Sequence, residues 1–421
     1  MLVYVLNSSG QPMMPTRRFG KVRRMLKNNQ AVIVNYEPFV IQLTYETTNY
    51  VQEVTLGVDT GSIHVGLSAT TEKRELYASE TDFRSKQVKQ RLKSRSEARR
   101  RRRSRLRYRP ARFNNRAKSK KKGWLAPSMQ HRIDSHLRVI DNVSKILPIK
   151  KYVLEIGIFD TQKMANPDIS GEEYQRGQTV GCANVKAFVR FRDKNKCRQC
   201  NGKSGDKHIE VHHIQHKEDG GPDRPDNMVC LCQTCHRQYH AGKIKLKKFQ
   251  LNRANAKSLR DAAAMNIIKD RVLQGVKEKY PDKEVRTTYG YITRWNRAKY
   301  NIDKSHANDA YVIAGNFSAK QLDYYYKGFQ VRRHNRQIHK DTIQKGGIPK
   351  NNQAEHLVFG FALNDRIRYN GEIYFIKGRR NKGFFSLSDA SGKEVMNSVH
   401  HSRLKRISYE KSLIYKRISK F

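Results

Sequence analysis

The chain has 421 residues, of which 37% are hydrophobic, and its 85 Lys and Arg outnumber 38 Asp and Glu to give a net charge of +47. This length allows roughly two to four domains with a sizeable core. So much positive charge would repel itself in a free globule and favours a polyanionic partner, above all nucleic acid. No apolar run approaches the roughly 20 residues that span a bilayer, and the first residues show no secretory signal. We therefore expect a cytoplasmic protein with no membrane partner.

The first part of the chain alternates between strand and helix patterns. Residues 1–50 contain short apolar runs around a basic segment, which predicts a small strand-helix-strand unit. Residues 54–69 predict a strand, a turn that contains Gly61, and a second strand. Asp59 lies at the end of the first of these strands, facing the glycine turn, where a carboxylate is well placed to hold a metal.

Residues 84–122 form an unusually basic segment, with 20 Lys and Arg and a single acid, Glu97. A helix here has no apolar face to bury, so we expect it to be stable only against phosphates. The alternative is a disordered basic tail or a solvated patch, but the internal position argues against a tail. Phe113 and Trp124 offer aromatic surfaces beside this charge, as is common in RNA binding. The candidate nucleic-acid contacts are Arg95, Arg99, Arg100, Arg101, Arg102, Arg103, Arg105, Arg107, Arg112 and Arg116.

The remaining elements continue the alternation. Residues 131–149 have helical spacing, and residues 150–156 predict a buried strand that carries Glu155. After an insertion at 197–240 come a helix over 258–280, a strand over 284–292 and a last helix that begins near Ser305. From about residue 357 a two-residue alternation with turn residues predicts a small all-β module.

Three acids from these elements are candidates for a nuclease metal site. Cutting a phosphodiester requires a nucleophilic water and a stabilised leaving oxygen, which two hard cations held by carboxylates can provide. Asp59 and Glu155 each follow an apolar strand and Asp309 opens a helix, so a mixed sheet could bring them to one edge. His306, three residues before Asp309, could activate water. Taken singly these are weak signals, since a lone Asp after a strand is more often a turn residue and the HANDA segment that contains Asp309 could be an N-cap box.

The inserted segment carries four cysteines in two CxxC pairs, which in a reducing compartment predict a zinc site. The pairs are Cys197 with Cys200 and Cys232 with Cys235, and the 31 residues between them exceed an ordinary ribbon loop. We assign no role to the other two cysteines, Cys182 and Cys230.

The long loop between the pairs carries the candidate catalytic residues. We expect His213 to be a general base that polarises water, and His212 and His236 to be ligands of one divalent cation. Asn227 would orient either the loop or the base. The alternative is a purely structural zinc finger whose histidines bind phosphate.

These motifs carry a resemblance to a known family. The segment 197–240 is similar to an HNH (ββα-metal) nuclease, and Asp59, Glu155, His306 and Asp309 resemble a split RuvC nuclease of the RNase H fold. Nested behind an arginine-rich helix, they resemble IscB, a transposon-encoded relative of the type II CRISPR effector nucleases. The opening QPMMPTRR resembles the PLMP motif of that family, with Met13 in place of Leu.

The resemblance implies an α/β multidomain fold and an RNA-guided DNA endonuclease, a metal-dependent phosphodiester hydrolase. A structured, omega-type guide RNA would be read by base pairing while the protein reads a short motif flanking the double-stranded target. The HNH site would cut the guide-paired strand and the RuvC site the displaced strand, with Mg²⁺ or Mn²⁺ at both sites and Zn²⁺ at the four cysteines. The chain would be a monomer within a prokaryotic ribonucleoprotein, acting on DNA of the nucleoid.

The implied domains divide the whole chain. They are a PLMP domain (1–52), RuvC-I (53–83), the bridge helix and basic segment (84–122), RuvC-II (123–186), the HNH domain (187–248), RuvC-III (249–328) and a C-terminal β-rich module that faces the target-adjacent motif (329–421). Two other readings stay open. One is a homing or restriction-type HNH endonuclease that needs no RNA, and the other is a non-catalytic RNA-binding scaffold.

Overall fold

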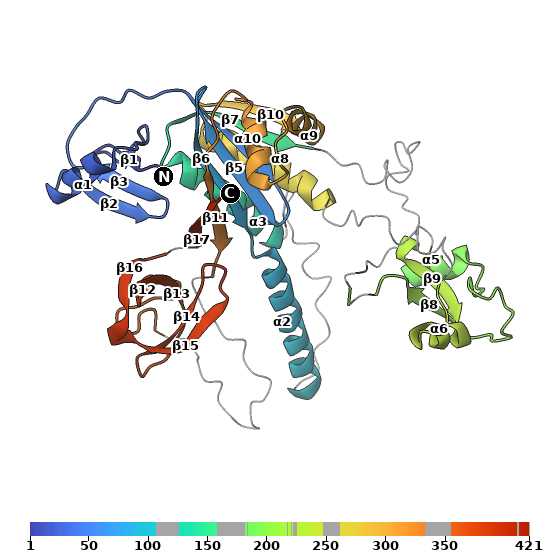
Figure 1. The fold of residues 1–421 in the computed structure, drawn as a ribbon. Helices are drawn as coiled ribbons and strands as arrows, with labels where there is room; N and C mark the ends of the chain where they lie inside the picture. Colours follow the sequence, from blue (N-terminus) through green and yellow to red (C-terminus); the bar gives the residue numbers. More distant parts are fainter. Residues whose placement is uncertain are drawn as a thin grey trace. The chain divides into compact units, whose positions relative to one another are not determined.

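The computed structural model describes residues 1–106, 125, 127–157, 182, 184–216, 218–219, 221, 225–246, 262–332, 355–410 and 412–420. The chain forms two units, one made of Met1–Gly157 with Ile267–Phe421 and the other of Ile158–Asn266 (Figure 1). The second unit thus interrupts the first along the sequence.

A seven-stranded mixed sheet organises the first unit. Its strands, in spatial order, are β10 (Glu284–Tyr289), β7 (Ile149–Ile156), β4 (Val54–Thr60), β5 (His64–Thr70), β6 (Glu75–Asp82), β11 (Tyr324–Gln330) and β17 (Leu413–Ser419). Strands β4, β5 and β6 form an antiparallel meander, and β7 lies parallel to β4. Every residue of β4 is buried, as its apolar sequence predicts for a central strand.

Helix α10 (His306–Ala314) lies directly against β4 and β5 because two glycines leave it room. A Cβ atom at Gly57 would lie 2.0 Å from the carbonyl oxygen of Ala310, and one at Gly66 only 1.8 Å from that of His306. No side chain fits in either gap. The two glycines therefore set how closely this helix approaches the sheet.

Among the described residues, the first unit also contains α2 (Ser85–Leu106), α3 (Pro127–Ser144), α9 (Gly290–Lys299) and most of α8 (Ala262–Lys279). Helix α2 spans much of the basic segment, and its Arg95, Arg99 and Arg100 are exposed. The side chains of Arg101, Arg102, Arg103 and Arg105, and the whole of Arg107, Arg112, Phe113, Arg116 and Trp124, lie outside the described residues.

The predicted strand over 284–292 is too long. Strand β10 ends at Tyr289, whose partner Ile156 is the last residue of β7, and Gly290 begins helix α9. In the part of the chain that the structure describes, the ladder between β10 and β7 ends at the pair Tyr289–Ile156, and the chain continues from Gly290 as a helix.

The N-terminal segment folds around a small sheet of its own. Strands β1 (Tyr4–Leu6), β3 (Phe39–Leu43) and β2 (Ala31–Tyr36) lie in that order, and helix α1 (Phe19–Lys27) packs on them. Val22 and Met25, one turn apart on α1, are its buried contacts.

The C-terminal segment forms a five-stranded antiparallel sheet. Its spatial order is β15 (Glu394–His400), β14 (Phe384–Ser388), β13 (Glu372–Arg379), β12 (Arg366–Tyr369) and β16 (Lys405–Ser408), with a short turn η4 (His401–Arg403). The last strand, β17, does not join it and instead pairs with β11 in the large sheet. The all-β module expected from residue 357 is thus present and is followed by a strand of the main sheet.

The second unit is built on a ββα arrangement. Strand β8 (Ile209–His213) pairs antiparallel with β9 (Met228–Cys232), and helix α6 (Gln233–His240) follows directly. Helix α5 (Val185–Arg192) and a 3-10 turn η3 (Pro225–Asn227) complete it. Among the described residues of both units, no helix is long and apolar enough to cross a membrane.

Candidate metal centres

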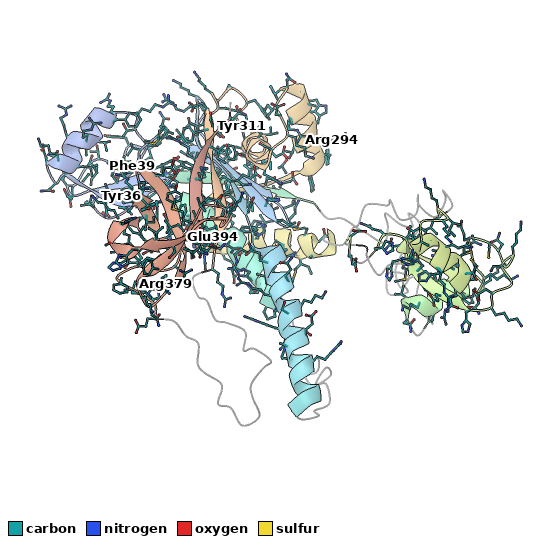
Figure 2. The ribbon with its side chains drawn as sticks, turned by 60° about the horizontal axis from the view of Figure 1, so that its bottom comes forward. Tyr36, Phe39, Arg294, Tyr311, Arg379 and Glu394 are labelled. Carbon is teal, nitrogen blue, oxygen red and sulfur yellow. The ribbon has the colours of Figure 1, made fainter. Side chains whose placement is uncertain are left out.

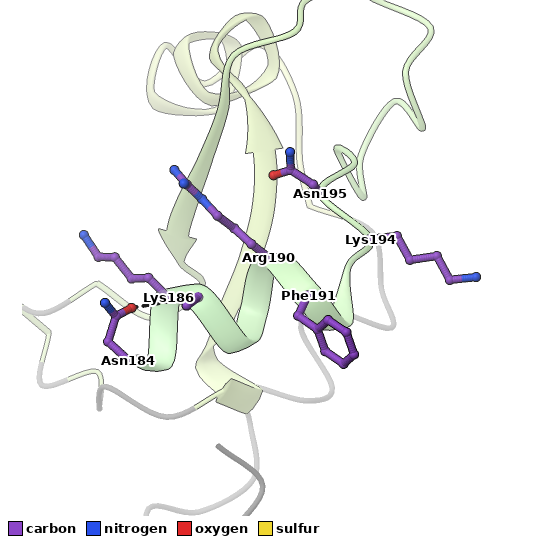
Figure 3. A pocket seen from close by; sticks show the side chains of 7 residues that line it. Asn184, Lys186, Arg190, Phe191, Lys194 and Asn195 are labelled. Carbon is purple, nitrogen blue, oxygen red and sulfur yellow. Dashed lines mark hydrogen bonds between the residues drawn. The ribbon is translucent and has the colours of Figure 1, made fainter. Parts of the chain in front are cut away.

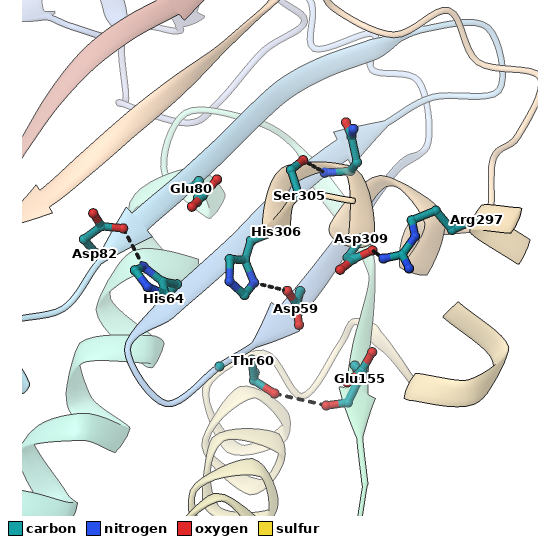
Figure 4. A network of polar contacts seen from close by, with 12 residues as sticks. Asp59, Thr60, His64, Glu80, Asp82, Glu155, Arg297, Ser305, His306 and Asp309 are labelled. Carbon is teal, nitrogen blue, oxygen red and sulfur yellow. Dashed lines mark hydrogen bonds and ion pairs between the residues drawn. The ribbon is translucent and has the colours of Figure 1, made fainter. Parts of the chain in front are cut away.

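The structure brings Asp59, Glu155 and Asp309 to one region of the large sheet (Figure 4). Asp59 and Glu155 lie one residue beyond the paired residues Val58 and Leu154 of the parallel strands β4 and β7. The hydroxyl of Thr60 donates a hydrogen bond to the backbone carbonyl of Glu155 at 3.1 Å. Asp309 and His306 lie in the first turn of α10, which packs on these strands. The fold therefore places these three acids and His306 in one region of the sheet.

Each of the three carboxylates has a cationic or histidine partner. His306 Nδ1 lies 2.6 Å from Asp59 Oδ2, Lys269 Nζ lies 3.1 Å from Glu155 Oε1, and Arg297 Nη1 lies 2.7 Å from Asp309 Oδ1. The hydrogen bond to Asp59 raises the pKa of His306. Burial raises the pKa of Asp309, although Arg297 opposes that shift.

The three carboxylates nevertheless do not form a closed ligand set in this structure. Among the residues that it describes, Asp59, Glu155 and Asp309 are not a group whose oxygens all lie within 4.8 Å of one another. Their oxygens are hard donors of the kind that Mg²⁺ or Mn²⁺ prefers. A divalent cation held by them would compete with Lys269 and Arg297 for the same oxygens.

His64, which the sequence did not single out, lies beside His306. The two imidazoles stack with centroids 5.2 Å apart, and His64 Nδ1 lies 2.7 Å from Asp82 Oδ1. Ligand atoms of His64, Glu80 and Asp82 lie within 4.8 Å of one another. However, Lys327 Nζ lies 3.0 Å from Glu80 and 2.7 Å from Asp82. This group is therefore an ion-pair network rather than an open metal site.

In the second unit the four thiols of the CxxC pairs converge. Their Sγ atoms all lie within 4.8 Å of one another, and Cys200 Sγ is 3.8 Å from Cys232 Sγ. A tetrahedral zinc with Zn–S bonds of about 2.3 Å has sulfurs about 3.8 Å apart. The geometry therefore fits Zn²⁺. Cys182 does not belong to this cluster, and Cys230 is buried against helix α5, where its Sγ lies 3.7 Å from Val189 O.

Three histidines form a second potential ligand group close by in sequence. His236 Nε2 lies 3.1 Å from His212 Nδ1 and 3.2 Å from His240 Nε2. Burial and, to a smaller extent, the charge repulsion of the neighbouring histidines together lower the pKa of His212 to about 3, so its imidazole is neutral and available as a ligand. Glu210 Oε2 lies 2.9 Å from His236 Nδ1 and orients that ring, as outer carboxylates commonly do in metal sites.

His240 is the member of this potential ligand group that the sequence interpretation missed. The signal was present, since His236 and His240 are four residues apart on one helix and so lie on the same face. Three imidazoles favour a transition-metal dication over Mg²⁺. That preference departs from the Mg²⁺ expected at His212 and His236.

His213 and Asn227, the other two residues expected to act in this unit, lie outside the group of three histidines. His213 follows His212 on strand β8, and successive strand residues point to opposite faces. Asn227 is buried and binds the backbone of Gln215, accepting from its N–H at 2.9 Å and donating to its carbonyl at 3.0 Å. These contacts fix the loop after β8, which is one of the two roles considered for Asn227.

Helix α5 carries a separate basic depression of about 820 Å³ (Figure 3). Lys186, Arg190 and Lys194 lie around it together with Phe191, whose side chain is exposed. None of the histidines or clustered cysteines lines it. It offers charge for a polyanion but no metal ligands.

Comparisons with known proteins match two parts of the chain. Residues 3–177 match the family model described as RRXRR protein, and residues 197–242 match the HNH endonuclease model. The type IV methyl-directed restriction enzyme EcoKMcrA of Escherichia coli K12 is 36% identical over 90 residues. Those residues are 20% of this chain and 28% of that relative, so the chain spans well under a third of its length.

Solved Cas9 structures share a weak overall likeness. Streptococcus thermophilus Cas9 in complex with the AGAA PAM is 15% identical, with a TM-score of 0.32 over 60% of this chain and 32% of that one. The type II-C Cas9 of Actinomyces naeslundii is 12% identical, with a TM-score of 0.24 over 63% of this chain and 60% of that one. A likeness this weak supports no functional conclusion for this chain.

Proposed function

We propose that this chain, an IscB-like RuvC/HNH nuclease by its RRXRR and HNH domains, is an RNA-guided endonuclease that cuts both strands of a DNA duplex. The HNH match and the restriction-enzyme relative support a metal-dependent DNA endonuclease. The observation that carries the two-strand proposal is the presence of two ligand sets of different chemistry on two units. One is a set of carboxylates on the sheet, and the other is a set of imidazoles in the ββα unit.

At the sheet, Asp59, Glu155 and Asp309 would hold Mg²⁺ or Mn²⁺. Bound there, the metal lowers the pKa of water and neutralises charge on the leaving oxygen. His306 lies within hydrogen-bond distance of Asp59 and can take the proton of the attacking water. Because Asp59 fixes Nδ1 of the ring, Nε2 is the atom that accepts that proton.

In the ββα unit, His212, His236 and His240 would hold one divalent cation that neutralises the scissile phosphate. His213 would be the general base, and Asn227 would hold the loop that follows it. The four cysteines would hold a structural Zn²⁺ that links the end of strand β9 to the turn that contains Cys197 and Cys200. All of these residues lie within a single unit, so its cut should not depend on the sheet site.

The RNA-guided part of the proposal depends on charge. The net charge of +47 and the exposed arginines of helix α2 suit a polyanion that stays bound. We propose that a structured guide RNA occupies this basic surface and pairs with one target strand, which the HNH site cuts, while the sheet site cuts the displaced strand. The C-terminal module would read a short flanking motif, within a monomeric ribonucleoprotein that acts on prokaryotic DNA.

Strand-resolved cleavage tests the proposal. Asp59→Ala should nick only the guide-paired strand and His213→Ala only the displaced strand, whereas the exposed controls Asp134→Ala and His208→Ala should cut both. The assay uses the protein with the RNA that co-purifies with it and a duplex labelled differently on each strand. If one active-site change abolishes both cuts in a protein that still folds, the two-site proposal fails.

The similarity to a restriction enzyme favours one alternative, a protein-read HNH endonuclease. That enzyme would keep cutting specific DNA after RNase treatment. Loss of all specific cutting with RNase, restored by adding back one discrete RNA, supports the guided mechanism instead.

A further inference from the structure

Helix α9 presents an unusual row of exposed aromatic rings. Tyr291 is 72% exposed, Trp295 61% and Tyr289 47%. Tyr291 and Trp295 are four residues apart and so lie on one helix face. The rings of Tyr289 and Tyr291 are stacked, with centroids 5.8 Å apart and an interplanar angle of 15°. Neighbouring large aromatic surfaces that remain exposed commonly mark a binding site.

Positive charge surrounds these rings. Arg294, labelled in Figure 2, is exposed on the same helix, and Lys299 Nζ lies 4.9 Å from the centre of the Trp295 ring. The helix sequence GYITRWNRAK contains no acid. Flat aromatic surfaces flanked by cations bind single-stranded nucleic acid, because the rings stack on bases and the cations meet phosphates.

The helix also lies beside the carboxylates of the sheet. A Cβ atom at Gly290, its first residue, would lie 3.3 Å from Glu155 Oε1. One turn from its end, Arg297 forms the 2.7 Å ion pair with Asp309. A strand bound on α9 would therefore lie next to the candidate cleavage site.

We infer that Tyr289, Tyr291 and Trp295 form a stacking platform for unpaired bases of the displaced DNA strand. This inference rests on the proposed function, since it names how one strand reaches the sheet site. A duplex cannot use the platform because its bases are already stacked inside. The position beside Glu155 and Asp309 favours the strand that is cut there over the guide RNA.

Tryptophan fluorescence tests the platform without any cutting. The sequence has two tryptophans, so Trp124→Phe leaves Trp295 as the single reporter. We expect an oligothymidine to quench Trp295 in the protein bound to its co-purifying RNA, and Tyr291→Ala to weaken that binding about tenfold. Tyr50→Ala, which removes a ring that is 87% exposed elsewhere, should leave the affinity unchanged.

Three results would overturn the inference. The first is that oligothymidine does not quench Trp295, and the second is that a fully paired duplex quenches it equally. The third is that the bound RNA already quenches Trp295 fluorescence and added DNA does not change it. The last result would assign the face to RNA.

Cleavage provides an independent readout. Tyr291→Ala and Trp295→Ala should slow cutting of the displaced strand about tenfold while the guide-paired strand is cut at the wild-type rate. Equal loss at both strands, with unchanged thermal unfolding, would contradict a platform specific to one strand. If the wild-type chain cuts neither strand, the proposed function fails; if it cuts both while these variants behave as wild type, only this inference fails.

Discussion

His306 Nδ1 lies 2.6 Å from Asp59 Oδ2, although 247 residues separate the two along the chain. The contact exists because helix α10 lies directly on the backbone of β4 and β5. Gly57 and Gly66 permit that approach, since a Cβ atom at either position would overlap a carbonyl oxygen of the helix. The geometry of the candidate site thus depends on two glycines that carry no chemistry of their own.

Gly66→Ala should separate these two residues. Its Cβ atom would lie 1.8 Å from the carbonyl oxygen of His306, so the helix must shift. Forcing extra volume into a packed contact lowers the unfolding free energy by about 1–3 kcal/mol. Because the shift moves His306 away from Asp59, cleavage of the displaced DNA strand should also be lost. Thermal unfolding and strand-resolved cleavage measure the two effects.

A matched substitution is available in helix α1. Gly20 has no heavy atom within 4 Å of a built Cβ, so Gly20→Ala should leave cutting unchanged and stabilise the helix by about 0.5–1 kcal/mol. A Gly66→Ala protein that is as stable as wild type and still cuts both strands would refute the proposed role of the close approach.

The three acids of the candidate sheet site could be predicted because local sequence patterns identify them. Asp59 and Glu155 follow apolar strands, and Asp309 lies in the first turn of a helix capped by the Ser305 side chain, so their convergence could be expected. His240 could also have been found from its spacing to His236. The partners Lys269 and Arg297 could not, because they depend on how distant elements pack.

The same limit explains two features of the fold. The pairing of β17 with β11 depends on a long-range register that no local pattern encodes. Likewise, β10 ends where its neighbour β7 ends, so the helix that begins at Gly290 could not be inferred from the β-prone run before it.

Loss of one cysteine should release zinc from the second unit. Cys197 is buried in the cluster that holds this unit together, and structural zinc contributes folding energy directly. Cys197→Ser should lower the zinc content and the unfolding temperature of this unit, as measured by metal analysis and differential scanning calorimetry. Cys182→Ser removes a thiol outside the cluster and should change neither. Full zinc content in the Cys197 variant would contradict the four-thiolate site.

His240→Ala should weaken the cation site of the same unit. His240 supplies one of three imidazoles, so its loss should reduce Co²⁺ affinity at least about tenfold. Calorimetric titration into protein that carries Asp59→Ala, which impairs the sheet site, and a single equivalent of zinc for the four cysteines isolates this binding event. His208→Ala, an exposed histidine outside the group, is the control. Unchanged Co²⁺ affinity would exclude His240 as a ligand.

Arg366 should be far more important for stability than Arg368, the other arginine of strand β12. It is 2% exposed and pairs with Glu37 at 2.6 Å and with Glu410 at 2.8 Å. Arg366→Ala leaves two poorly solvated carboxylates without their cation, which should cost about 3–5 kcal/mol of unfolding free energy. Arg368→Ala, two residues on and exposed, should cost well under 1 kcal/mol. Similar denaturation midpoints for the two variants would rule out this role.

Glu75 should make stability depend on pH. The residue is 1% exposed, and burial raises its pKa even though Lys420, Ser68 Oγ and the Leu322 N–H partly stabilise the charge. Between its unfolded and folded pKa values, the folded protein binds more protons at Glu75 than the unfolded chain does. The unfolding free energy therefore falls as pH rises through that window.

Glu75→Gln removes this titration, while its amide oxygen can still accept a hydrogen bond from Ser68 or from Leu322. The stability of the variant relative to wild type should therefore increase as the pH rises from acidic to neutral, which chemical denaturation at a series of pH values measures. Glu46→Gln, at an exposed position, is the control substitution. A Glu75→Gln difference that does not vary with pH would mean that Glu75 titrates alike in the folded and unfolded chain.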